Sequence, residues 1–176
     1  CLYSKKRYCG LMYEHLDKDP TIDIKGLQVV RRDNCELTKD VCNGIINAFL
    51  IDKDIDKAKK IVQNIANNLI ENKIDVNKLV LSKSLNKHYK SDNLPHKIVA
   101  EKVGKRDPGN APQSGDRIPY VFIKTANLKD KQFEKAEDPN WVIKNKLELD
   151  SAYYLIHQIK NPVLDLFSVI IDNPLE

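Results

Sequence analysis

The stretch DIDKAKKIVQNIANNLI, residues 54–70, decides the fold class of this chain. Its apolar residues recur every three or four positions, which is the spacing of one face of a helix. They are Ile55, Ala58, Ile61, Val62, Ile65, Ala66, Leu69 and Ile70. Asp54 precedes them, where an N-cap residue belongs. The stretch therefore predicts a helix whose apolar stripe packs into a core.

A second helical pattern lies just upstream of this one. Its apolar residues are Val41, Ile45, Ile46, Phe49 and Leu50. Thr38 is the expected N-cap residue. Because the spacer between the two patterns is short, we expect an antiparallel pair of helices.

The first 30 residues have the pattern of strands. Residues 3–13 are β-prone, 17–20 form a turn, 22–25 alternate, and 27–30 are apolar after Gly26. Such a ribbon is too small to be stable alone, so it should pack on another part of the protein.

Shorter elements are expected downstream. The expected strands are 79–82 and 118–123, with Pro119 placing the second at a sheet edge or strand start. One helix is expected over 96–103, between Pro95 and Gly104. Three more are expected over 139–146, 151–160 and 162–171, and their start signals are Asp138-Pro139, Asp150 and Pro162, in that order. Residues 105–116, KRDPGNAPQSGD, should form a loop. The fold class is therefore α+β: a small antiparallel β ribbon, then a mostly helical domain with a few short strands, the change falling near 32–36.

Composition and charge limit the function classes. The 176 residues are 41% hydrophobic and 31% charged, as in globular proteins, and no apolar run has membrane-spanning length. The net charge of +4 is uneven, because residues 81–125 hold nine Lys/Arg against four Asp/Glu. This block suits a phosphate backbone, although a solvated basic face is the commoner origin of such a run. The five arginines among many lysines fit either phosphate contacts or structural ion pairs.

Patterns of catalysis or metal binding are missing from the sequence. The cysteines, Cys1, Cys9, Cys35 and Cys42, form no CxxC pair, so we expect free and mostly buried thiols. The four histidines stand alone and favour surface or capping roles. No glycine-rich phosphate loop and no aspartate cluster for two metals is present. The chain alone does not have the pattern of a complete enzyme.

Four segments, in order, resemble motifs of family B DNA polymerases. Residues 5–10, KKRYCG, resemble the KKRYAG motif near the end of the palm, and 25–35, KGLQVVRRDNC, resemble the KGxExVRRDxC stretch of delta-like members. Residues 105–121, KRDPGNAPQSGDRIPYV, resemble the thumb motif KRDPxxAPxxGDRVPYV. Glu137-Asp-Pro, followed by Tyr153-Tyr154-Leu155, Gln158 and Pro162, resembles the ending EDP…YYLxxQxxxPL.

The resemblance implies that residues 1–33 end the palm domain and residues 34–176 form the thumb. The parent function would be template-directed DNA synthesis from dNTPs, with Mg²⁺ held by aspartates upstream, so that this chain alone is inactive and binds no cofactor. Its implied partners are duplex primer–template DNA, the upstream palm, fingers and exonuclease portion, and a sliding clamp. The alternatives are a non-catalytic polymerase-derived DNA-binding protein and a subunit-interaction module. The Lys, Asn and Ile bias is typical of an AT-rich genome, such as that of a large DNA virus, and the expected location is the nucleus or cytoplasm of a host cell.

The resemblance assigns DNA contacts but no catalytic or metal-binding residue. The expected contacts are Lys5, Lys6, Arg7, Tyr8, Lys25, Gly26, Arg31, Arg32, Lys83, Lys105, Arg106, Gly115, Arg117 and Tyr120. Tyr8 would reach the minor groove or pack in the core, and Gly26 would admit a phosphate or only form a turn. Arg106 would bind phosphate or pair with Asp107 or Asp116. Asp116 should be a structural partner of Arg117 or of loop amides.

Overall fold

The computed structural model describes residues 2–4, 7–14, 20–26, 33–127 and 129–172. The chain divides into two units: Cys1–Asn68 with Leu155–Glu176, and Leu69–Tyr154. We call them the first and the second unit. Helices and two small antiparallel sheets confirm the α+β class. No described helix is long and apolar enough to cross a membrane.

The first sheet belongs to the first unit and confirms the expected ribbon. Strands β1 (Leu2–Ser4), β2 (Arg7–Met12) and β3 (Thr21–Lys25) pair antiparallel in the order β1-β2-β3. Cys9 lies opposite Ile24, and Tyr8 lies opposite Lys25. Because side chains alternate along a strand, these two pairs face opposite sides of the sheet. The expected turn over 17–20, except Pro20, and the apolar 27–30 fall outside the described residues.

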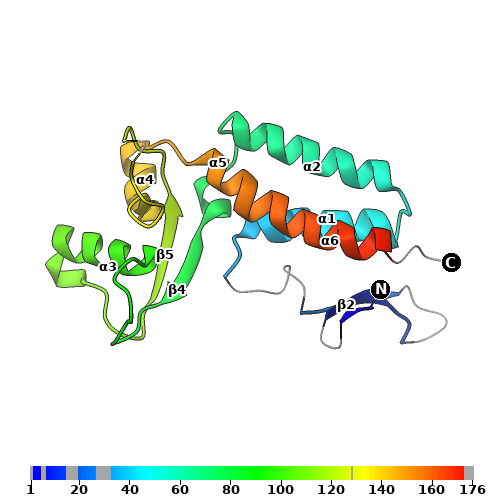
Figure 1. Ribbon diagram of the computed structural model, residues 1–176, viewed down its shortest axis with the longest axis horizontal. Helices are drawn as coiled ribbons and strands as arrows, with labels where there is room; N and C mark the ends of the chain where they lie inside the picture. The colour runs from blue at the N-terminus through cyan, green and yellow to red at the C-terminus, as the bar shows by residue number, and fades with distance from the viewer. Residues whose placement is uncertain (1, 5–6, 15–19, 27–32, 128, 173–176) are drawn as a thin grey trace. The chain divides into compact units, whose positions relative to one another are not determined.

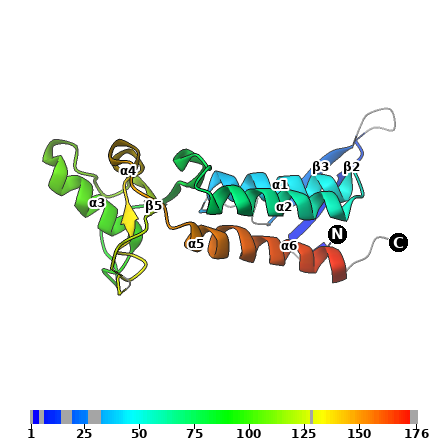
Figure 2. The same cartoon turned by 90° about the horizontal axis from the view of Figure 1, so that it is seen from above.

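Two of the predicted helices are α1 (Glu36–Leu50) and α2 (Ile55–Ile70), which lie side by side in Figures 1 and 2. A Cβ on Gly44 of α1 would lie 3.4 Å from Ile61 of α2, an ordinary van der Waals contact, so the two helices are close to each other at this position. Asp54 caps α2, because its carboxylate accepts the N–H of Lys57 at 2.9 Å. Thr38 does not cap α1, which begins two residues earlier with Cys35 at the N-cap.

The apolar stripe of α2 is only partly buried. Ala58 and Leu69 are each 2% exposed, whereas Ile55 and Ile70 are 47% and 61% exposed. These two isoleucines are the first and last residues of the helix, where fewer neighbours cover a side chain. The expectation that the whole stripe is core was therefore wrong at its ends.

The two helices expected over 151–160 and 162–171 form one continuous helical run. It consists of α5 (Ser151–Tyr153), the π-helical segment η4 (Tyr154–Lys160) and α6 (Asn161–Asp172), and α6 packs against α1. Pro162 has no N–H to donate to the carbonyl of Gln158, four residues earlier. The hydroxyl of Thr38 donates to that carbonyl at 2.8 Å instead. The proline thus changes the helix geometry without ending the helix.

The second unit is built around the antiparallel sheet β4-β5-β6. Its elements are η2 (Val76–Leu79), β4 (Leu81–Ser84), α3 (Pro95–Arg106), η3 (Pro108–Asn110), β5 (Arg117–Phe122), β6 (Ala136–Glu137) and α4 (Pro139–Asn145). Helix α3 packs on β5 and β6, and α4 packs on β5 (Figure 1).

Two expected boundaries in the second unit were wrong. The first expected strand begins at Leu81 instead of residue 79, because a turn of 3₁₀ helix occupies Val76–Leu79. Helix α3 continues through Gly104 to Arg106, so Lys105 and Arg106 are helical. Gly104 lies within the helix instead of ending it, and a Cβ there would make an ordinary contact with that of Ala111 at 3.4 Å.

The thiols behave as expected, but one histidine does not. Cys9, Cys35 and Cys42 are buried and free, and burial raises the pKa of Cys42 to about 12. Cys1 lies outside the described residues. His96 is only 5% exposed, against the expected surface or capping role. Within the described residues, no three His, Cys, Asp or Glu side chains form a group that could hold a metal ion.

Candidate nucleic-acid interface

The first candidate contact surface is one face of the ribbon. Tyr8, Asp23 and Lys25 share this face, because Tyr8 lies opposite Lys25 and Asp23 lies opposite Gly10. The Tyr8 hydroxyl donates to Oδ2 of Asp23 at 2.7 Å, and the Lys25 ammonium lies 5.6 Å from the centre of the Tyr8 ring. The hydrogen bond with Tyr8, aided by the charge of Asp23, raises the pKa of Lys25.

This geometry limits what Tyr8 can offer to DNA. A phenol has one proton, and the minor groove presents mainly acceptors. In this conformation the proton is given to Asp23, so Tyr8 can contribute its ring and its oxygen lone pairs, while donors must come from lysine or arginine. Tyr8 is half-buried. The sequence missed Asp23, although the alternation Ile22-Asp23-Ile24 places its carboxylate on the face opposite the isoleucines.

Other residues expected at this surface are only partly described. Lys5, Lys6, Arg31 and Arg32 lie outside the described residues, and of Arg7 only the backbone is described, as the first residue of β2 opposite Ser4. Gly26 has φ 71°, a left-handed conformation that favours glycine and fits a turn.

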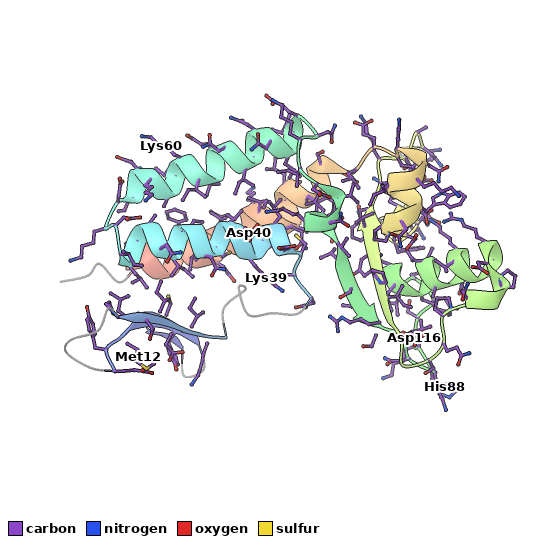
Figure 3. The ribbon with its side chains drawn as sticks, turned by 180° about the vertical axis from the view of Figure 1, so that it is seen from behind. Met12, Lys39, Asp40, Lys60, His88 and Asp116 are labelled. Carbon is purple, nitrogen blue, oxygen red and sulfur yellow. The ribbon has the colours of Figure 1, made fainter. Side chains whose placement is uncertain are left out.

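The second candidate surface is the end of the β4–β5 pair, which we call the strand tip. Beyond Ser84, the N–H of Leu85 donates to the carbonyl of Asp116, and that of Gly115 donates to the carbonyl of Leu85, each at 2.8 Å. Gly115 has φ 102°, which an L side chain rarely adopts. The Asp116 carboxylate accepts the N–H of Gln113 at 2.7 Å, so its expected structural role is confirmed. Figure 3 shows His88 and Asp116 at this same end of the second unit.

Arg117 and Lys83 place positive charge at the strand tip. Arg117 begins β5 opposite Ser84, and its guanidinium donates to Oγ of Ser82 at 2.7 Å and to the Ser82 carbonyl at 3.2 Å. Lys83 is exposed on the neighbouring strand, opposite Ile118. Because side chains alternate along a strand, Lys83 and Arg117 face opposite sides of the sheet, and both are exposed.

Tyr120 does not fit its expected DNA contact. Its side chain is 6% exposed, and its ring packs edge-on against Phe122 with 5.7 Å between ring centres. The alternation of β5 turns Tyr120 to the same side as the buried Ile118. It is a core residue.

Arg106 also has a structural partner, and it is not one of the two aspartates considered from the sequence. Its two terminal nitrogens donate to the two carboxylate oxygens of Glu137, each at 2.9 Å. Its guanidinium stacks over Trp141, 3.9 Å from the ring centre. Such a two-pronged bond holds the guanidinium in one orientation. Arg106 is therefore a structural residue in this conformation and not a free phosphate contact.

Glu137 makes the second unit sensitive to acid. Burial alone would raise its pKa, but the hydrogen bonds from Arg106 and the Asp138 N–H, with the charge of Lys102, hold the pKa below the ordinary 4.5. A carboxyl whose folded-state pKa is lowered contributes stability above its unfolded value, and this is lost as pH falls through the folded value.

We expect Glu137→Gln to loosen residues 95–142 at pH 7, and the difference from the unmodified protein to shrink below pH 4.5. Hydrogen-exchange protection factors of these amides, measured from pH 7 to pH 3, check this. A difference that is constant over this range would show that the charge of Glu137 contributes nothing.

Eight of the nine cations of residues 81–125, all except Arg117, fall into two groups. Lys97 pairs with Asp92 and Glu101, Lys102 and Arg106 pair with Glu137, and Lys124 pairs with Glu148. In contrast, no ion pair within the described part of the chain involves Lys83, Lys87, Lys90 or Lys105. All four are exposed. Two of these lysines, Lys83 and Lys105, were expected from the sequence to contact DNA, whereas Lys87 and Lys90 were not.

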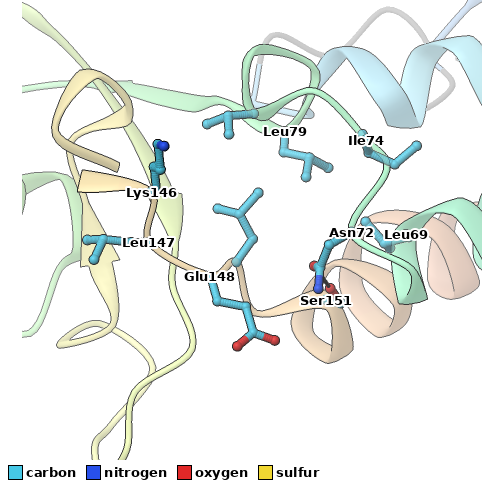
Figure 4. Close-up of a pocket in the computed structure, with 10 residues that line it drawn as sticks. Leu69, Asn72, Ile74, Leu79, Lys146, Leu147, Glu148 and Ser151 are labelled. Atoms are coloured by element: carbon cyan, nitrogen blue, oxygen red, sulfur yellow. Dashed lines mark hydrogen bonds between the residues drawn. The ribbon is translucent and has the colours of Figure 1, made fainter. Parts of the chain in front are cut away.

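A hollow of about 290 Å³ in the second unit is not part of either surface. Leu69, Ile74, Leu79 and Leu149 form its apolar wall, and Ser151 donates to Asn72 at 3.0 Å beside it (Figure 4). None of the residues expected to contact DNA lines it.

Comparisons with known proteins place the chain in a family. The model of the family described as DNA polymerase family B matches residues 1–170. The DNA polymerase delta catalytic subunit of Candida albicans is 41% identical over 170 residues, and that of Glycine max is 41% identical over 174 residues. These matches cover 97% and 98% of this chain but 16% of each relative, so the chain spans about one sixth of their length.

A solved structure has the same fold. The family B DNA polymerase of the archaeon Pyrobaculum calidifontis superposes with a TM-score of 0.72 and 26% identity, covering 98% of this chain and 21% of that one. The sequence matches and the structural match thus indicate the same family as the four motifs. The chain belongs to DNA polymerase family B.

Proposed function

We propose that this chain is the end of the palm and the thumb of a delta-like, template-directed DNA polymerase, and that it holds the primer–template duplex during synthesis. The observation that carries the proposal is the group of exposed lysines without ion pairs in the described residues of the second unit, on a chain of this family. Exposed cations without carboxylate partners are free to neutralise phosphates.

The proposed grip acts on the DNA backbone. Lys83, Lys105 and Arg117 would contact phosphates, which fix the position of a duplex but carry no sequence information. This suits an enzyme that must copy every sequence. We assign residues 1–33 to the palm and residues 34–176 to the thumb.

The ribbon would serve the primer end. Tyr8, held by Asp23, and Lys25 beside it would lie along the minor groove, where acceptors occur on every base pair. Nucleotidyl transfer would use Mg²⁺ held by aspartates outside this chain. The partners are then primer–template DNA and the other polymerase domains, with a sliding clamp as a further candidate.

The test uses the complete polymerase that carries this chain. Replacing Lys83 and Lys105 together by alanine should reduce the slope of log affinity against log salt by about two, because each phosphate contact releases close to one counterion. Lys124→Ala is the matched control, since Lys124 already pairs with Glu148 at 2.9 Å. An unchanged slope in the double variant would contradict the proposed grip.

A second measurement separates synthesis from simple DNA binding. We expect the complete polymerase to extend a primer with dNTPs and Mg²⁺. Duplex binding without any extension would favour a non-catalytic DNA-binding protein derived from a polymerase.

A further inference from the structure

We infer that the turn of residues 84–90 is a second phosphate-binding site, held in shape by a hydrogen bond between Tyr89 and His96. We call this turn the lysine turn, after Lys87 and Lys90. The inference rests on the proposed function and extends it, because neither lysine was among the expected contacts. Its ligand is the phosphodiester backbone of the duplex.

The hydroxyl of Tyr89 closes the lysine turn. It accepts the backbone N–H of Asn86 at 2.6 Å and lies 3.4 Å from the carbonyl of Ser84. It also lies 3.0 Å from Nε2 of His96, in the first turn of α3. One oxygen thus joins the start and the middle of the turn to the helix.

His96 is a suitable anchor because its ring is buried and oriented. The ring is 5% exposed, and it meets the Tyr89 ring edge-on at 5.5 Å between centres. Burial lowers the pKa of His96, and the charge of Lys83 lowers it further, so both favour the neutral ring. Within the described residues Nδ1 has no hydrogen-bond partner. The bond from Nε2 to Tyr89 therefore sets the ring orientation.

The other end of the lysine turn is held by the strand tip. Leu85 exchanges two backbone hydrogen bonds with Gly115 and Asp116, each 2.8 Å long. The turn is thus fixed at Leu85 and again at Tyr89, while Lys87 and Lys90 point their charges into solvent without an ion pair in the described residues. Cations on a fixed turn lose less entropy on binding than cations on a loose one.

The charges around the turn leave a net attraction for phosphate. A hollow of about 450 Å³ lies between the turn and α3, with Lys87, His88 and Tyr89 on its wall. Its two carboxylates, Asp92 and Glu101, both pair with Lys97. Lys87 and Lys97 together balance these two carboxylates, and the exposed Lys90 adds one further positive charge to the turn.

The inference is tested on the complete polymerase with a primer–template duplex. Replacing Lys87 and Lys90 together by alanine should reduce the salt slope by about two and weaken binding on the order of tenfold near 0.1 M salt. Lys124→Ala should change neither quantity. Tyr89→Phe keeps the ring but removes the hydroxyl, and it should weaken binding several-fold through faster dissociation.

A double-mutant cycle shows whether Tyr89 acts through the lysines. In the background of Lys87→Ala with Lys90→Ala, the additional change Tyr89→Phe should have almost no effect on DNA affinity. A tyrosine that only stabilises the fold would lower DNA affinity by the same factor in both backgrounds. Thermal unfolding of each variant would then show the accompanying loss of stability.

The outcomes separate the inference from the proposed function. If the Lys83 and Lys105 variant loses slope but the Lys87 and Lys90 variant does not, the lysine turn is no phosphate site and the thumb assignment stands. If the Lys87 and Lys90 variant loses slope while Tyr89→Phe binds normally, the role of Tyr89 is wrong. If neither lysine pair matters, the proposed grip itself fails. The lysine variants are surface changes, so this reading does not depend on how Tyr89→Phe folds.

Discussion

Replacing Arg106 by alanine should lower the free energy of unfolding of the second unit by about 3 kcal/mol, because it leaves a buried carboxylate without its main partner. Glu137 is 4% exposed, and after the change only Lys102, 3.5 Å away, would still offset its charge. The stacking of Arg106 on Trp141 would also disappear. A decrease of this size corresponds to roughly 12–24 °C in melting temperature for a domain of fewer than about 100 residues.

The neighbouring residue provides a matched control. Lys105 is exposed and makes no ion pair with the described residues, so Lys105→Ala should change stability by less than about 0.5 kcal/mol. The effects on DNA binding should be reversed. Lys105→Ala should reduce the salt slope by about one, and Arg106→Ala, measured below its melting temperature, should leave it unchanged. Thermal unfolding and salt titration of both variants check this, and a stable Arg106→Ala with a reduced slope would restore Arg106 as a phosphate contact.

Local signals account for the parts of the fold that the sequence predicted. Asp138 and Asp150 were expected to begin helices, and their carboxylates accept the N–H of Trp141 at 2.9 Å and of Tyr153 at 3.0 Å. Asp54 does the same for α2. In each case the signal lies within three residues of the group that it satisfies, so it can be read without the fold.

Two of the failures involve partners that are distant in the sequence. The sequence considered Asp107 and Asp116 as partners of Arg106, but the actual partner, Glu137, is 31 positions away. Thr38 had the residue type of an N-cap, yet its hydroxyl donates to the carbonyl of Gln158, 120 positions away. The partners of both side chains are set by how helices and strands pack together. The spacing of residues along the chain does not show this packing.

The candidate interface shows the same division. Counting charges located the basic block but not which of its cations are neutralised, because four of them pair with carboxylates through the fold. Motif resemblance selected Tyr120, which the alternation of β5 buries. It did not select Lys87 or Lys90, because their proposed contact with phosphate depends on the shape of a turn. That turn is closed by the hydrogen bonds of Tyr89 with Asn86 and His96.

Tyr8→Ala should slow nucleotide incorporation from the bound complex on the order of 100-fold, while duplex affinity falls much less. In the proposed function the Tyr8 ring lies at the primer end, where a misplacement of about 1 Å costs this much in the chemical step. Duplex affinity depends less on this one side chain, because contacts with many phosphates along the duplex contribute to it. Single-turnover incorporation with saturating DNA separates the two effects, because only the rate of the bound complex is then observed.

Tyr8→Phe is the matched variant that locates the effect within the side chain. The hydroxyl proton is already given to Asp23 at 2.7 Å, so the phenylalanine ring should still occupy the site and slow incorporation less than tenfold. Asp23→Ala removes the same hydrogen bond from the other side, and it should slow incorporation to a similar extent as Tyr8→Phe. If Tyr8→Phe were as slow as Tyr8→Ala while Asp23→Ala remained fast, the hydroxyl itself would contact the DNA. Tyr8 would then have to release Asp23 when the duplex binds, and the ring alone would not explain the slower incorporation.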